Sequence, residues 1–142
     1  MRTVAIAMTL FALMMVIPAQ AQTVRQMNAA IPFDFNIGDA RYEAGVYEIK
    51  PSCSSQVIWC VKPQSGGPER FFFAAQNGGM NKQPEKPILI FERVGGVNFL
   101  KEIQVRGNSL NWTVSKGKMQ REITATTSNS ASTVEVALAP QP

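Results

Sequence analysis

Apolar and polar residues alternate along most of this chain, as they do in β-strands, where successive side chains face opposite sides of a sheet. Residues 31–37 (IPFDFNI) show the pattern most clearly and predict one half-buried strand with Ile31, Phe33, Phe35 and Ile37 on its apolar face. Pro32 lacks an amide hydrogen, which places it near the start or edge of that strand. Further alternating runs occupy residues 46–50, 56–62, 110–115 and 134–138.

One run departs from this alternation. Arg70–Ala75 (RFFFAA) is apolar at consecutive positions. A strand covered on both faces has that composition, so the run predicts a central strand of a sandwich or barrel.

Glycine- and proline-containing turns separate the runs, and one of them defines a hairpin. Ile88–Val94 and Val97–Val105 flank Gly95-Gly96, which permits the positive φ angles of a tight turn. A two-residue turn would place Phe91 opposite Leu100, whereas a three-residue loop starting at Val94 would place it opposite Phe99. The sequence leaves both registers open.

The turn spacing predicts an all-β fold: a single small antiparallel β-sandwich or closed β-barrel of about seven or eight short strands. Residues 29–125 are its expected extent, with a flexible lead-in at 22–28 and a short helix at 119–124. Residues 126–142 begin as a polar low-complexity segment and end in either a final strand or a loose tail.

The first 21 residues predict an export signal. Arg2 is followed by an apolar run to Pro18, and Ala19-Gln20-Ala21 has the small-x-small pattern at which signal peptidase cleaves. The apolar run is too short for a membrane-spanning helix. We therefore expect cleavage after Ala21, no transmembrane segment in the mature chain, and a periplasmic or secreted protein.

Composition narrows the classes of function. The formal net charge is +4, but the basic residues are dispersed among acidic ones, which argues against a nucleic-acid surface. The chain contains no histidine, which excludes Ser-His-Asp and Cys-His catalysis and histidine metal sites. We expect no enzyme activity, no cofactor and no metal.

Several short motifs carry a resemblance. PFDF at 32–35, AGVYEI at 44–49 and FERVGG at 91–96 resemble a group of small, uncharacterised exported bacterial β-rich proteins. The likeness covers roughly residues 29–125. It implies export and a β-rich architecture, and no activity or site residue.

Cys53 and Cys60 are the only cysteines, and an exported protein can join such a pair as a disulfide. On one straight strand their side chains would lie too far apart and on opposite faces. The Ser54-Ser55 break can fold Cys53 back. A disulfide and two separate buried thiols both remain open.

A few polar residues invite a catalytic interpretation. Asp34 lies between two phenylalanines, which can raise a carboxyl pKa, but alternation places it on the opposite face. Glu92 and Glu102 lie across the expected hairpin, where charge pairing on the surface is the ordinary explanation. Tyr42 and Tyr47 predict a structural corner. The polar connection Gln76–Pro87 is the best placed loop for binding.

Three hypotheses of function follow. The first is a non-catalytic exported β module that binds an envelope or extracellular protein or polymer. The second is a carrier that holds a small apolar ligand inside a barrel. The third is a carboxylate-based polysaccharide hydrolase, which needs two carboxyl groups facing one cleft.

Overall fold

The computed structural model describes residues 26–52, 54–55, 57–78, 84–105, 110–127 and 131–140. The predicted signal peptide lies outside the described residues, as does Cys53. The described elements, in chain order, are β1 (Met27–Ile31), β2 (Phe35–Ile37), β3 (Ala40–Tyr42), β4 (Gly45–Pro51), β5 (Ile58–Pro63), β6 (Arg70–Gly78), β7 (Ile88–Val94), β8 (Val97–Gln104), β9 (Leu110–Val114), α2 (Lys118–Thr126) and β10 (Ser132–Pro140).

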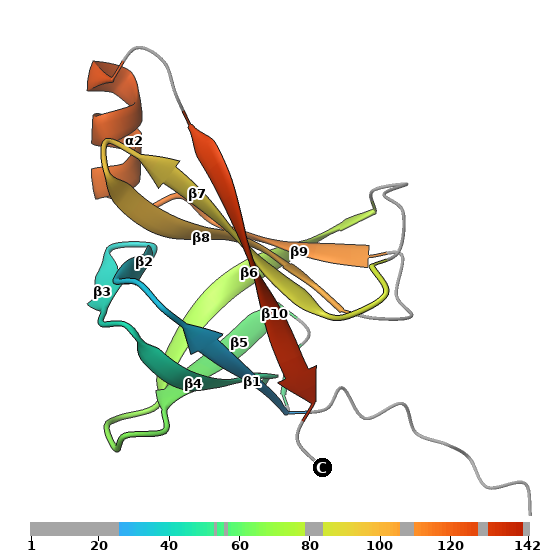
Figure 1. The fold of residues 1–142 in the computed structure, drawn as a ribbon. Coiled ribbons are helices and arrows are strands. Elements are labelled where there is room, and N and C mark those ends of the chain that lie inside the picture. Colours follow the sequence, from blue (N-terminus) through green and yellow to red (C-terminus); the bar gives the residue numbers. More distant parts are fainter. Residues whose placement is uncertain are drawn as a thin grey trace, which may run out of the picture.

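The strands close into an antiparallel barrel (Figure 1). Around the ring the order is β8, β7, β10, β1, β4, β5, β6 and β9, and β9 pairs back with β8. The β2–β3 hairpin lies outside this ring and joins β8 through a parallel pairing of Phe35 with Asn98. The predicted all-β fold is confirmed, and of the two predicted architectures the structure is the closed barrel.

The first and last described strands pair with each other in the barrel wall. β10 lies between β1 and β7, with Ala29 opposite Leu138 and Phe91 opposite Val134. The apolar alternation at 134–138 is thus a strand of the ring. Because β1 begins at Met27 and β10 reaches Pro140, the barrel extends beyond residues 29–125 at both ends.

The predicted strand at 31–37 is wrong in one respect, because the chain makes two strands there. β1 ends at Ile31 and β2 begins at Phe35. Pro32, which has no amide hydrogen to donate, stands at the break. Ile31, Phe35 and Ile37 are buried as expected, whereas Phe33 is only partly buried.

The β7–β8 hairpin has the two-residue turn. Val94 pairs with Val97, and Phe91 lies opposite Leu100. Gly95 and Gly96 adopt φ angles of 57° and 81°, which a residue with a side chain rarely adopts. A β-bulge then shifts the register of the hairpin between Ile90 and Phe91. Phe91 lies opposite Leu100, whereas Ile90 lies opposite Glu102.

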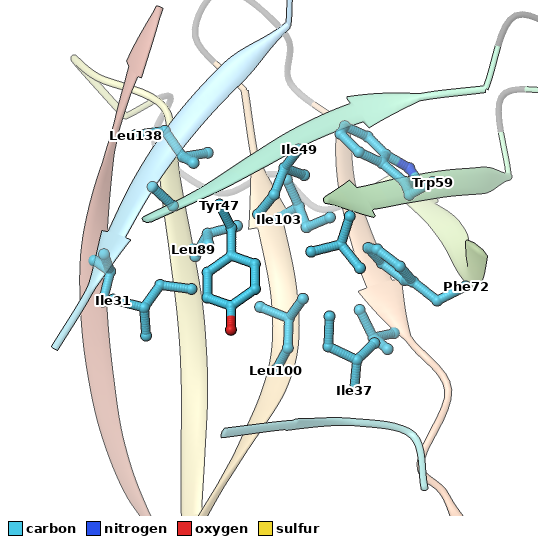
Figure 2. Packing of buried hydrophobic residues seen from close by; sticks show 14 of the residues in the cluster. Ile31, Ile37, Tyr47, Ile49, Trp59, Phe72, Leu89, Leu100, Ile103 and Leu138 are labelled. Atoms are coloured by element: carbon cyan, nitrogen blue, oxygen red, sulfur yellow. The ribbon is translucent and has the colours of Figure 1, made fainter. Parts of the chain in front are cut away.

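Side chains from around the ring fill the interior, as Figure 2 shows for part of the cluster. Phe35 and Phe91 are both buried, and their ring centroids lie 5.5 Å apart. Trp59 and Trp112 form a second edge-to-face pair at 5.4 Å. An eight-stranded barrel has an interior just wide enough for such packing or for one small ligand.

Helix α2 covers one end of the barrel wall, beside the β7–β8 turn (Figure 1). Its buried Gln120 donates a hydrogen bond from Nε2 to Oε2 of Glu92 on β7 at 3.0 Å. The N-cap residue of α2 is Gly117, which has no side chain to accept a hydrogen bond from the first turn. Instead Asp39, in the β2–β3 turn, accepts a hydrogen bond from the Met119 amide at 3.1 Å. The expected short helix is present, and it joins two hairpins that are distant in sequence.

Candidate functional site

The outer face of β6 carries the largest exposed apolar side chains of the described residues. Phe71 is 64% exposed and Phe73 is 67% exposed, whereas Phe72 and Ala74 point into the barrel and are buried. The prediction of a strand covered on both faces is therefore wrong for Arg70–Ala75. A run of consecutive apolar residues cannot distinguish a face covered by the protein itself from one available to another molecule.

Strand pairing extends this surface onto β5. Ile58 lies opposite Phe73 and Cys60 lies opposite Phe71. Residues directly opposite each other share a face of the sheet, so these four side chains form one outward surface. We call Ile58, Cys60, Phe71 and Phe73 the β5–β6 patch.

Polar groups border the β5–β6 patch on both sides. On β4, Lys50 lies opposite Cys60 and contacts Glu48 and Glu69, each at 3.1 Å. The hydrogen bonds to Glu69 and Glu48 raise the pKa of Lys50 above its ordinary value. On the side of β9, Asn77 donates a hydrogen bond to the Thr113 hydroxyl at 2.7 Å. An apolar centre with a polar rim is the usual anatomy of a protein interface.

Cys60 belongs to the β5–β6 patch but is buried between its neighbours. Its cross-strand partner Phe71 and its other neighbour Lys50 lie on either side. Because Cys53 lies outside the described residues, the predicted Cys53–Cys60 disulfide stays a prediction.

Asp34 has the electrostatics of a structural carboxylate. Its Oδ2 accepts a hydrogen bond from Arg41 and its Oδ1 accepts one from the Ala44 amide, both at 2.9 Å. The bond from Arg41, followed by that from Ala44, holds the pKa of Asp34 below its ordinary 3.8. A general acid needs a raised pKa, so this environment acts in the opposite direction.

The two glutamates of the hairpin are not cross-strand partners. Glu92 lies opposite Phe99, and Glu102 lies opposite Ile90. The Glu92 side chain is only 13% exposed and interacts with Gln120, with Lys116 at 3.4 Å and with Lys101 at 3.8 Å. The hydrogen bond from Gln120 attaches α2 to the barrel, and both lysine contacts add to the engagement of the Glu92 carboxylate.

Tyr42 and Tyr47 form the corner that the sequence predicts. Their ring centroids are 6.0 Å apart, and the Tyr47 hydroxyl donates a hydrogen bond to the Glu43 carbonyl at 2.6 Å. Burial raises the pKa of both phenols. Of the polar connection at 76–87, the first three residues extend β6, and 79–83 lie outside the described residues.

The barrel interior holds one polar group of interest, the indole of Trp59. Trp59 is fully buried, and its Nε1 has no hydrogen-bond partner among the described residues. A buried N–H without an acceptor costs free energy.

Neither a cluster of metal-binding side chains nor a membrane-spanning helix occurs in the described part of the chain. No group of three or more histidine, cysteine, aspartate or glutamate side chains is arranged there to hold a metal ion. No helix in the described ranges combines the length and the apolar character needed to cross a membrane.

Comparison with known proteins adds no relative. No protein family, curated protein or solved structure matches this chain. The β5–β6 patch must therefore be interpreted from its own geometry.

Proposed function

We propose that this protein is a non-catalytic exported β module that binds an envelope or extracellular protein through the β5–β6 patch. The observation that carries the proposal is the exposure of Phe71 and Phe73 on the outer wall of a closed barrel. Export rests on the signal predicted at residues 1–21.

The size of the patch supports a role as a binding anchor. A whole phenylalanine side chain has roughly 200 Å² of surface. Exposed fractions of 64% and 67% thus leave roughly 130 Å² on each ring. Removing one ring from water is worth up to about 3 kcal/mol at about 25 cal/mol per Å², from which the entropic cost of association is subtracted. An aromatic side chain of this exposure is suited to serve as an interface hot spot.

The environments of Asp34 and Glu92 argue against the hydrolase hypothesis and so support the same proposal. Asp34 has a lowered pKa, and Glu92 is engaged by α2. Glycoside hydrolysis requires a carboxyl group with a raised pKa and a second carboxylate that faces it. The contacts of Asp34 act on its pKa in the opposite direction, and the side-chain partners of Glu92 are Gln120, Lys101 and Lys116.

The experiment is affinity capture from an envelope extract with residues 22–142. The double variant Phe71→Ser/Phe73→Ser should lose a partner that the native sequence retains, with affinity reduced by roughly tenfold or more. Its matched control is Val46→Ser/Val57→Ser, because Val46 and Val57 are also exposed, at 43% and 44%, and lie outside the β5–β6 patch.

The control should retain the partner. Equal recovery with both double variants would contradict the proposal, and so would the absence of any specific partner combined with hydrolysis of a polysaccharide.

A further inference from the structure

One backbone hydrogen bond of β6 shows which of its residues direct their N–H and C=O groups toward β5. The Ala74 amide donates to the Val57 carbonyl on the β5 side at 2.9 Å. In an antiparallel ladder, alternate residues direct their N–H and C=O groups to opposite edges of the strand. Phe72 therefore pairs toward β5 like Ala74, whereas Phe71 and Phe73 direct their backbone groups toward the other edge.

That other edge is only partly occupied. β9 pairs with β6 from Ala74 to Gly78, and its last residue, Val114, lies opposite Ala74. Among the described residues, no strand pairs with Arg70–Phe73 on this edge. No described loop supplies a backbone hydrogen bond to Phe71 or Phe73 either.

We propose that this edge of Arg70–Phe73 accepts an extended segment of the partner protein as an additional β-strand. The inference rests on the proposed function and specifies how the partner binds. The residues whose backbone groups face the edge are the same two whose rings are exposed on the outer wall. One added strand can therefore satisfy the backbone groups of Phe71 and Phe73 and cover their rings.

The surroundings define the chemistry of the added strand. Its outward side chains must be apolar at alternate positions to cover Phe71 and Phe73. Arg70 is exposed at the start of the edge, and no salt bridge of Arg70 is found in the described part of the chain. Its guanidinium lies over the Tyr42 ring, 5.7 Å from the centroid. An acidic side chain on the inward face of the added strand would complement Arg70.

The exposed area of Phe71 and Phe73 favours an added strand over a dimer in which these rings pack against those of a second copy of the chain. The two rings expose roughly 260 Å² together, whereas a stable interface buries about 800 Å² per partner. Ring contacts alone are too small. A strand adds backbone hydrogen bonds and a second row of side-chain contacts at the same place.

The test uses an acetylated and amidated nonapeptide of alternating valine and glutamate, with residues 22–142 as the protein. We expect saturable binding, with amide exchange of Phe71 and Phe73 slowed by roughly tenfold or more while that of Phe72 stays unchanged. A valine–lysine peptide of the same pattern should bind roughly tenfold more weakly because of Arg70. N-methylation of alternate amides along one edge of the valine–glutamate peptide should abolish binding.

Failure of the valine–glutamate peptide to bind would overturn strand addition, as would binding that leaves the Phe71 and Phe73 amides unchanged. If exchange of both amides in the free protein becomes slower as the protein concentration rises, a second copy of the chain occupies the edge. That result would also overturn strand addition by a partner protein. These outcomes are separate from those that contradict the proposed function, which are equal recovery of the envelope partner with both double variants, or the absence of a specific partner combined with hydrolysis of a polysaccharide.

Discussion

Replacing Phe91 by alanine is expected to lower the free energy of unfolding by about 3–5 kcal/mol. Phe91 is fully buried, and its ring packs edge-to-face against Phe33 at 5.2 Å and Phe35 at 5.5 Å. Truncation removes these contacts and leaves a cavity that the surrounding strands can only partly fill, because each is held by neighbours on both sides. Urea unfolding followed by tryptophan fluorescence measures the loss.

The matched control makes the same substitution on the outer wall. Phe71→Ala should change the free energy of unfolding by no more than about 0.5 kcal/mol, because the Phe71 ring is mostly in solvent. Similar losses for the two variants would contradict the assignment of Phe91 to the interior and Phe71 to the exterior.

Gly117→Ala is expected to destabilise the protein by about 1–3 kcal/mol through a steric clash alone. Gly117 has a φ of −70°, which alanine adopts readily. A Cβ atom there would lie 2.6 Å from the carbonyl carbon of Gly38 and 2.8 Å from its oxygen. These are backbone atoms of the β2–β3 turn, so the turn and the start of α2 must move apart, weakening the hydrogen bond from the Met119 amide to Asp39.

The control for this substitution is Gly78→Ala. A Cβ atom on Gly78 meets nothing within 4 Å, so we expect a change within about 0.5 kcal/mol. Urea unfolding gives the free energies, and amide exchange at Met119 reports the cap. An unchanged stability and an unchanged Met119 amide in Gly117→Ala would show that α2 does not pack against the β2–β3 turn.

Local patterns in the sequence predicted most of the strands, the short helix and the position of the hairpin turn, but they left the length of that turn and the final strand open and merged β1 with β2. These features depend on residues within a few positions of each other, as with Gly95-Gly96 between two alternating runs. The bulge in β8 was not predictable. It places Leu100 and Ile103 on the inward side although they are three residues apart, so simple alternation fails there.

Long-range pairing also lay beyond local patterns. Nothing near Phe35 indicates that β2 pairs in parallel with β8, or that β10 fills the gap between β1 and β7. The candidate site was missed for a related reason. Hydrophobicity identified Phe71 and Phe73 as important but assigned them to the core, because only the completed barrel shows which of its walls lacks a covering layer.

Residue-resolved amide exchange of β6 in the free, dilute protein tests the central claim most directly. The account predicts slow exchange at Phe72 and Ala74, which pair with β5, and fast exchange at Phe71 and Phe73, which face the unoccupied edge. Equally slow exchange at all four amides would contradict it, because the edge would then already be covered.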